Sequence, residues 1–256
     1  MKKEKFIKKN NYIYIYGKHA AFAALENRNR FIAEVFFEHK NIEFEKKIID
    51  IIKNYRPKLI MQKTSKNIID SMLGTKIKHQ GILLKAQKLQ PNNYRSIFKQ
   101  NNNISYGVYL DNLNDPQNVG AIYRSAYMFN FSFILTSLNK NPIETNSLLN
   151  AASGAYEKIK TLYGNNVLQI IKEFKKSGWW VVGLDYSAKI NLNQFIKQYG
   201  KERRLLFFLG SEGKGIRRII KENCDLLVKI NTKEQKLSLN VSNTAAIVFD
   251  KIYNRI

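Results

Sequence analysis

Short apolar runs alternate with amphipathic stretches along the first 86 residues. Runs rich in aromatic and β-branched residues predict strands at 12–17, 32–37, 58–62 and 81–86. Apolar residues at helical spacing predict helices at 18–27, 44–55 and 64–72. Regular alternation of strand and helix is typical of a small α/β unit.

The alternation restarts after residue 104 with more strongly apolar runs. These runs predict strands at 105–110, 131–136, 179–184, 205–209 and 226–230, with helices beginning near 119, 148, 167, 216 and 241. Strands that are apolar on both faces are typical of a parallel sheet covered by helices on both sides. The second half is therefore predicted to be a larger α/β domain built on a parallel sheet.

A polar stretch separates the two halves. Residues 87–103 are rich in Lys, Gln and Asn, contain Pro91 and lack apolar periodicity, as linkers do. We therefore expect an N-terminal domain at 1–88, a linker at 89–103 and a C-terminal domain at 104–256.

The charge of the chain points to a polyanionic partner. Lys and Arg number 43 against 20 Asp and Glu, which gives a formal net charge of +23. Such an excess is larger than solubility requires and favours nucleic acid as the partner. A compositional bias towards Lys, Asn and Ile is the alternative explanation for part of it.

Other features exclude several classes of protein. No apolar run approaches the roughly 20 residues of a membrane-spanning helix, and residues 1–10 lack the apolar core of a secretory signal. We therefore expect a cytosolic protein. Cys224 is the only cysteine, which excludes a disulfide within the chain. The three histidines lie far apart and show no metal-ligand spacing, so we expect no metal.

The stretch DNLNDPQNVGAIYRSAYMFN at 111–130 is the first candidate site. A strand runs into an Asn-Asp-Pro-Gln-Asn turn, and a helix with one apolar face follows. Asn118 stands where an N-cap residue belongs, and Arg124 lies off the apolar face. By itself Arg124 would be an ordinary solvated arginine, but two further polar loops follow strands of the same domain.

These loops lie at 205–215 and 236–248. In LLFFLGSEGKG, three glycines and Glu212 follow a buried strand, at the edge of a parallel sheet where ligands bind. The glycine spacing fits neither a dinucleotide fingerprint nor a P-loop. In KLSLNVSNTAAIV, Ser238 and Asn240 are placed to cap the helix that follows. Three such loops on one sheet predict a shared site.

The three stretches resemble motifs of a known family. Asn114-Asp-Pro-Gln-Asn-Val-Gly120 with Arg124, Leu209-Gly-Ser-Glu-Gly-Lys-Gly215 and Leu237-Ser-Leu-Asn-Val-Ser242 are similar, in order, to three motifs of the SpoU family of RNA ribose 2′-O-methyltransferases. The resemblance spans about residues 105–253. The first domain resembles the family's ribosomal-protein-like substrate-binding domain in Ile15-Tyr-Gly-Lys-His19 and His79-Gln-Gly-Ile82. The pair is most similar to bacterial enzymes that methylate a guanosine ribose in large-subunit rRNA.

The resemblance implies an α/β domain with a deep C-terminal trefoil knot, S-adenosylmethionine as cofactor, and a homodimer that binds RNA. The positions that match the family's motifs imply catalytic roles for Asn118, Arg124, Glu212, Ser238 and Asn240. It assigns cofactor binding to Leu184 or Asp185 and to Leu209, Gly210, Glu212, Gly215, Ile230, Leu239 and Asn240. Ile230-Asn-Thr232 departs from the family's common Ile-Pro-Met, which implies a less rigid loop beside the cofactor.

Two roles for Arg124 follow from this assignment. A guanidinium normally stays protonated. Arg124 is therefore either a strongly perturbed base or a cation that holds phosphate and stabilises a developing alkoxide, and the second role fits its chemistry better. Two other functions stay open: methylation of tRNA, and a catalytically silent RNA-binding or ribosome-assembly protein.

Overall fold

A computed structural model describes residues 12–39, 42–74, 77–99, 105–137, 144–199, 202, 204–234 and 238–255. The chain divides into two compact units. The first contains Met1–Gln90 and Glu144–Lys158, and the second contains Pro91–Ile143 and Ile159–Ile256. Within the described ranges, no helix is long and apolar enough to cross a membrane.

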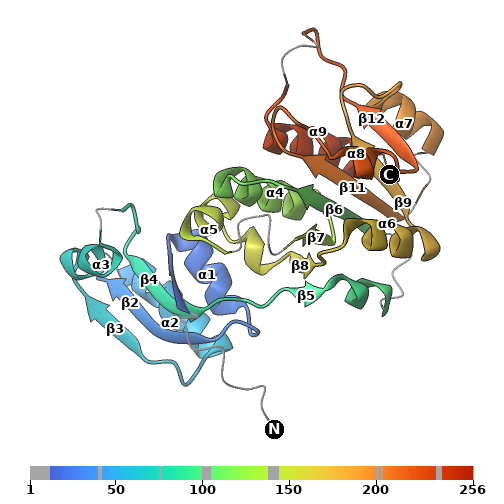
Figure 1. Cartoon of the computed structure of the whole chain (residues 1–256). Coiled ribbons are helices and arrows are strands. Elements are labelled where there is room, and N and C mark those ends of the chain that lie inside the picture. Colours follow the sequence, from blue (N-terminus) through green and yellow to red (C-terminus); the bar gives the residue numbers. More distant parts are fainter. Residues whose placement is uncertain are drawn as a thin grey trace. The chain divides into compact units, whose positions relative to one another are not determined.

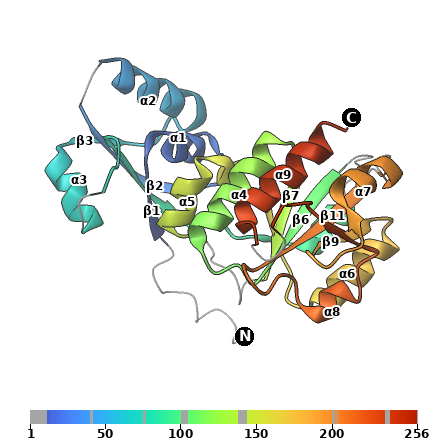
Figure 2. The ribbon, with the colours of Figure 1, turned by 90° about the horizontal axis from the view of Figure 1, so that it is seen from above.

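The first unit is built on a four-stranded mixed sheet (Figure 1). Its strands are β1 (Tyr12–Tyr16), β2 (Ile32–Glu38), β3 (Met61–Thr64) and β4 (Ile82–Gln87), in the order β1-β4-β2-β3. Helices α1 (Lys18–Glu26) and α2 (Ile42–Tyr55) lie on one side of the sheet, and α3 (Lys66–Leu73) lies on the other (Figures 1 and 2). The predicted small α/β unit is confirmed, although β3 begins three residues later than the predicted strand.

A segment from the second half of the sequence also belongs to the first unit. It contains α5 (Asn146–Ala152) and the short 3-10 helix η2 (Ala155–Glu157), which pack on β1 and α1. Gly154, at φ 89°, allows this close packing, since a Cβ there would lie 2.9 Å from both the His19 carbonyl oxygen and Ala23 Cβ. No local pattern in the sequence indicates this docking.

Buried charges hold the docked segment. The guanidinium of Arg30 bonds Glu144 and lies 2.5 Å from Glu157, and all three side chains are at most 3% exposed. Arg30 also donates to the Gln87 carbonyl, and Glu144 accepts from the Leu89 N–H. Burial by itself lowers the pKa of Arg30, but the carboxylates of Glu157 and Glu144 raise it overall, so the guanidinium stays charged.

Arg30→Met is expected to loosen this segment strongly. The variant would leave two carboxylates buried without their cation, which typically costs about 3–5 kcal/mol. Hydrogen exchange of the α1 and α5 amides measures that loss directly. Arg28→Met, at an exposed neighbouring position, should leave protection unchanged. Wild-type protection in Arg30→Met would contradict the prediction.

The second unit is built on a parallel sheet. Its strands, in the order β10-β12-β9-β11-β6-β7-β8-β5, are β5 (Asn92–Asn93), β6 (Ser105–Asp111), β7 (Phe133–Thr136), β8 (Lys160–Tyr163), β9 (Trp180–Leu184), β10 (Ile190–Asn191), β11 (Arg204–Gly210) and β12 (Leu226–Lys229). All strand pairings recorded among its described residues are parallel. The predicted parallel α/β domain is therefore confirmed.

Helices cover both faces of this sheet (Figure 2). On one face, α4 (Pro116–Met128) and α9 (Val241–Tyr253) lie side by side. On the other lie α6 (Val167–Lys176) and α8 (Arg218–Lys221), whose apolar residues join a cluster of buried core residues. Adjacent residues of β11 face opposite sides of the sheet. Phe208 belongs to that cluster, whereas Phe207 lies beside Phe131, whose ring packs on Phe249 of α9.

Several elements escaped the sequence-based prediction. Strand β8 and helix α7 (Leu192–Tyr199) were not predicted, because KTLY carries little apolar signal and NLNQFIKQY only a short one. The segment predicted as a linker contains β5 and the 3-10 helix η1 (Tyr94–Lys99). Tyr94 and Ile97 are each 5% exposed and belong to the core of the second unit.

Candidate active site

The carboxyl ends of the central strands bring the three polar loops together. Strands β6 and β11 pair in register, so that Gly210 lies opposite Asp111. Beside them, Leu184 at the end of β9 pairs with Val228 of β12. The loops after these strands therefore leave the sheet at one edge, as the sequence predicted.

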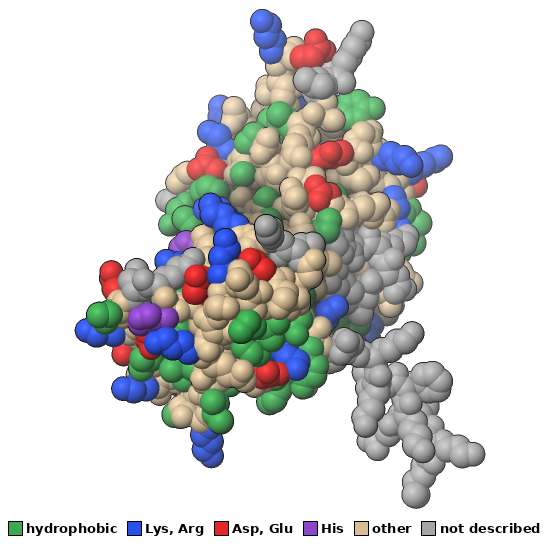
Figure 3. Space-filling model, turned by 90° about the vertical axis from the view of Figure 1, so that its left-hand side faces the viewer, with side chains coloured by type: hydrophobic (Ala, Val, Ile, Leu, Met, Phe, Trp, Pro, Cys, Tyr) green, Lys and Arg blue, Asp and Glu red, His purple; other side chains and the backbone are tan. Residues whose placement is uncertain are grey.

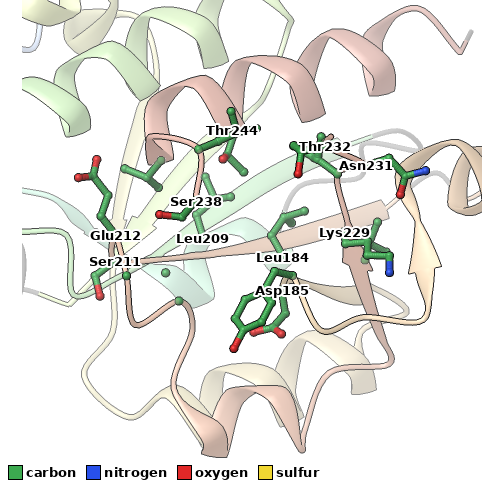
Figure 4. A pocket seen from close by; sticks show the side chains of 18 residues that line it. Leu184, Asp185, Leu209, Ser211, Glu212, Lys229, Asn231, Thr232, Ser238 and Thr244 are labelled. Atoms are coloured by element: carbon green, nitrogen blue, oxygen red, sulfur yellow. The ribbon is translucent and has the colours of Figure 1, made fainter. Parts of the chain in front are cut away.

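These loops line a cavity of about 820 Å³. Its walls combine apolar side chains, glycine backbone and polar groups, contributed by Leu184, Asp185, Tyr186, Leu209, Gly210, Ser211, Glu212, Gly213, Gly215, Val228, Lys229, Ile230, Asn231, Thr232, Ser238, Leu239, Val241 and Thr244. Figure 4 shows Ser211 and Glu212 at one end and Lys229, Asn231 and Thr232 at the other. The volume of this cavity and its mixture of apolar and polar lining residues are typical of a site for a small molecule or cofactor.

A hydrogen-bonded cluster joins one residue from each motif. Glu212 Oε1 accepts from Asn118 Nδ2 at 3.0 Å and from Asn240 Nδ2 at 2.7 Å. Asn240 Nδ2 also donates to Asn118 Oδ1 at 3.0 Å. Glu212 lines the cavity, so this cluster lies at its edge. Among the described residues, the other carboxylate oxygen of Glu212 accepts no hydrogen bond.

Asn118 is free to join this cluster because it is not the N-cap. The cap of α4 is Asp115, whose side chain accepts from the Gln117 N–H at 2.9 Å. Pro116 occupies the first helical position, where proline is favoured. The predicted helix start was therefore wrong, and Asn118 lies within the first turn with its amide directed at Glu212.

Of the two predicted caps of α9, one is found. Asn240 caps the helix through Oδ1, which accepts from the Ser242 N–H at 2.8 Å, and its Nδ2 is left for Glu212 and Asn118. Ser238 instead lines the cavity and makes no capping bond. Asn240 thus combines a structural role with a place in the cluster.

An ion pair missed by the sequence analysis holds the glycine loop against the first motif. Asp111 is buried, and its carboxylate accepts from Arg217 Nε at 2.8 Å and from the Arg217 N–H at 3.1 Å. Hydrogen bonds and charge from Asp111 raise the pKa of Arg217. Because Arg217 directly follows the 210–216 loop, the pair fixes the end of that loop. The only signal in the sequence was a charged residue at the end of an apolar strand.

Arg124 lies outside both the cavity and the Asn118–Glu212–Asn240 cluster. Its side chain is exposed on α4, it does not line the cavity, and among the described residues it makes no hydrogen bond or ion pair. Six residues of an α-helix turn by about 240° beyond one full turn, so Arg124 and Asn118 point from different sides of α4. The other predicted site residues lie at the cavity or in the cluster: Leu184, Leu209, Gly210, Glu212, Gly215, Ile230, Ser238, Leu239 and Asn240.

The cavity suits S-adenosylmethionine. Leu184, Leu209 and Leu239 offer apolar contact to a purine and a methionine chain, and the glycine loop offers backbone groups. About 820 Å³ lies within the range of cofactor pockets. The cofactor's reacting end would have to face the Asn118–Glu212–Asn240 cluster, where a second substrate can approach from solvent.

Comparisons with known proteins identify the family of the chain. Residues 105–250 match the SpoU rRNA methylase family, and residues 14–92 match the RNA 2′-O ribose methyltransferase substrate-binding family. An uncharacterized tRNA/rRNA methyltransferase of Borreliella burgdorferi is 30% identical over 226 residues, which cover 84% of this chain and 96% of the relative.

Solved structures share the fold. The SpoU methyltransferase AviRb of Streptomyces viridochromogenes, in complex with the cofactor AdoMet, superposes with a TM-score of 0.76 at 15% identity, covering 95% of this chain and 90% of AviRb. An AdoMet-bound rRNA methyltransferase of Sinorhizobium meliloti gives a TM-score of 0.76 at 15% identity, covering 96% and 88%.

The family match covers more than half of the chain and contains all three motifs. Together with the second match, it confirms the enzyme class and the cofactor that the sequence predicted. The chain belongs to the SpoU family of S-adenosylmethionine-dependent RNA methyltransferases.

Proposed function

We propose that this protein methylates the ribose 2′-hydroxyl of a guanosine in large-subunit rRNA. The observation that carries the proposal is the cluster in which Glu212 joins Asn118 and Asn240 at the edge of a cofactor-sized cavity. The substrate-binding match over residues 14–92 supports RNA as the partner. The choice of rRNA rests on the combination of the two domains.

The proposed chemistry divides between cofactor and chain. S-adenosylmethionine supplies an activated methyl group and its leaving group. The chain orients the ribose hydroxyl and stabilises the charge that develops as its proton leaves. We assign the Glu212 carboxylate as the acceptor of the hydroxyl proton, through the oxygen that accepts no hydrogen bond from the described residues. The amides of Asn118 and Asn240 hold the other oxygen, Oε1, in place. Ser238, at the cavity wall, positions the reacting groups.

Mapping of ribose methylation tests the substrate. RNA from cells that lack this gene is incubated with the purified protein and S-adenosylmethionine, and sites that become resistant to alkaline hydrolysis are located. A new 2′-O-methylguanosine in large-subunit rRNA is expected. A site in tRNA instead would favour the tRNA alternative, and no site in either RNA would favour the catalytically silent RNA-binding protein.

The first unit is proposed to select the RNA. Its two family-like sequence stretches meet there: the Gly17 N–H donates to the His79 carbonyl, and the Lys18 N–H donates to Gln80 Oε1. Lys18 and His19 are exposed at the start of α1. On the face shown in Figure 3, basic side chains are interspersed with acidic and apolar ones and do not gather in a single patch. We propose Lys18, exposed at this position, as a contact to the RNA phosphate backbone.

Lys18→Glu is expected to weaken RNA binding without changing cofactor binding. The logarithm of the RNA association constant falls linearly with the logarithm of the salt concentration. Loss of one phosphate contact should reduce the steepness of that line by about one unit. Filter binding at several salt concentrations measures that slope, and calorimetry measures S-adenosylmethionine affinity. Lys53→Glu, an equal charge change at an exposed site of α2, is the control. Equal slopes for the two variants would contradict the role of Lys18.

A homodimer is proposed through α4 and α9. These helices pack together and expose apolar or aromatic side chains on Tyr127, Met128, Ile247 and Tyr253, at 45%, 67%, 36% and 48%. Arg124 precedes Tyr127 and Met128 by one helical turn and so shares their face. A second copy seated on this face would let Arg124 of one copy act in the site of the other.

The dimer is expected to sediment at twice 29.8 kDa. Met128→Glu should produce monomers, because it places a charge within the proposed apolar interface. Ile60→Glu, at a 79% exposed position of the first unit, should leave the dimer intact. Wild-type monomers at micromolar concentration, with activity proportional to protein down to nanomolar, would count decisively against this interface.

A further inference from the structure

Tyr186 stands out at the mouth of the cavity. It lines the cavity directly after β9, and its side chain is 79% exposed. Among the large apolar and aromatic side chains of the described residues, only Ile60 is as exposed. An aromatic ring left in solvent at the edge of a ligand site gains apolar contact when a ligand arrives.

The backbone that carries this ring is held firmly. Asp185 is 5% exposed, and its Oδ1 accepts from the Ser187 N–H at 3.0 Å and from the Ser187 hydroxyl at 2.5 Å. Lys221 of α8 approaches Asp185 Oδ2 to 2.5 Å. The Asp185 N–H bonds the Val228 carbonyl, and the Ala188 N–H closes the turn on the Asp185 carbonyl. Tyr186 is thus fixed at its Cα, and only two side-chain torsions remain to be ordered on binding.

The position of the reactive cluster and the apolar lining of the cavity together indicate which part of the cofactor meets the ring. The methyl group must face Glu212, which lies at one end of the cavity (Figure 4). Leu184 and Asp185 lie away from that end, toward Lys229 (Figure 4). The sulfonium that carries the methyl group lies between the adenosine and methionine arms, so one arm would extend from Glu212 along the cavity. The apolar walls formed by Leu184, Val228 and Ile230 beside the turn that carries Tyr186 suit the purine better than the charged amino-acid end.

We propose that Tyr186 packs its ring on the adenine of S-adenosylmethionine and thereby sets the affinity for the cofactor. The proposal rests on the assignment of the cofactor to this cavity. Adenine offers a flat aromatic face of the kind that stacks on tyrosine, and Leu184, Val228 and Ile230 provide apolar walls around it. Tyr186 is a positioning residue for the cofactor and takes no part in the transfer of the methyl group.

Calorimetric titration of S-adenosylmethionine and S-adenosylhomocysteine into the full chain tests the proposal. Tyr186→Ala should weaken both ligands by about tenfold, since both carry the adenine and stacking on an aromatic ring is worth about that factor. Tyr186→Phe should bind both as the wild type does, because the ring is kept. Tyr55→Ala, at an exposed tyrosine of α2, is the control for loss of a surface aromatic ring.

A spectroscopic arm separates stacking from a merely structural effect. In Tyr186→Trp, saturating S-adenosylmethionine should quench the additional indole fluorescence, measured against the wild-type signal of Trp179 and Trp180. Wild-type affinity in Tyr186→Ala would overturn the proposal. So would weaker RNA binding with unchanged cofactor binding, which would make an RNA base the partner of the ring. A wild type that binds no S-adenosylmethionine would overturn the cofactor assignment itself, and the stacking with it.

Discussion

Arg124→Lys is expected to lower the single-turnover rate of RNA methylation by about 10²-fold or more while leaving S-adenosylmethionine affinity unchanged. Lysine keeps the positive charge and nearly the same helix propensity. If Arg124 were only a solvated surface residue, the methylation rate would therefore change little. A planar guanidinium can donate two parallel hydrogen bonds to a phosphate, and the single ammonium of lysine cannot reproduce that geometry. The cofactor should bind normally because Arg124 does not line the cavity.

The control for Arg124 is a second exposed arginine. Arg218 on α8 is 90% exposed and pairs with Glu222 at 2.6 Å, so Arg218→Lys should leave methylation unchanged. Single-turnover methylation and calorimetry are measured on both variants. A methylation rate near that of the wild type in Arg124→Lys would refute the catalytic assignment, and loss of cofactor binding would move Arg124 to the cofactor pocket.

Mixed dimers locate the site in which Arg124 acts. Chains with Arg124→Ala and chains with Glu212→Gln should each be inactive alone. If Arg124 crosses the interface, a mixed dimer contains one site with both residues intact, and activity reappears on mixing. If Arg124 acts within its own chain, no site in the mixed dimer is intact, and mixing restores nothing. The exposed position of Arg124 on α4 leads us to expect recovery.

Much of the site could be predicted from sequence because its parts follow a rule of α/β sheets. Polar loops after parallel strands meet at one edge, so motifs near residues 118, 212 and 240 were expected to converge, and their side chains are within 3.0 Å of one another. The cap of α4 was predicted wrongly because Asp115 and Asn118 are both good N-cap residues. Pro116 decides between them, since it fits only at the start of a helix.

The rest depended on contacts that no local pattern encodes. Arg30 and Glu157 are 127 positions apart, and nothing near either residue indicates that they pair. The same holds for Asp111 and Arg217, which are 106 positions apart. Tyr94 and Ile97 lie in a polar stretch that composition assigned to a linker, yet they are buried in the second unit. Tertiary packing decides such cases, and sequence periodicity does not report it.

Gly210→Ala is expected to abolish cofactor binding at ordinary concentrations, with a loss of about 10²-fold or more in S-adenosylmethionine affinity. A Cβ at this position would lie 2.0 Å from the Gly215 carbonyl carbon and 2.1 Å from the Ile216 nitrogen. Both are backbone atoms, so no side chain can turn aside, and the 211–215 loop must move. A displacement of about 1 Å at a binding site typically costs about 10²-fold.

Gly213→Ala separates this clash from ordinary loop strain. Gly213 has φ +79° and nothing within 4 Å of its Cβ position, so alanine there meets only the cost of a left-handed residue, about 1–2 kcal/mol, in an open loop. We expect Gly213→Ala to retain most cofactor affinity. Calorimetry on both variants, with circular dichroism to show that Gly210→Ala is folded, makes the comparison. Gly210 is the last residue of β11 and pairs with Asp111 of β6, so the loop after it begins at the sheet edge. Equal S-adenosylmethionine affinities for Gly210→Ala and Gly213→Ala would mean that this loop can move without harm to the site. That result would contradict the assignment of the cavity to the cofactor.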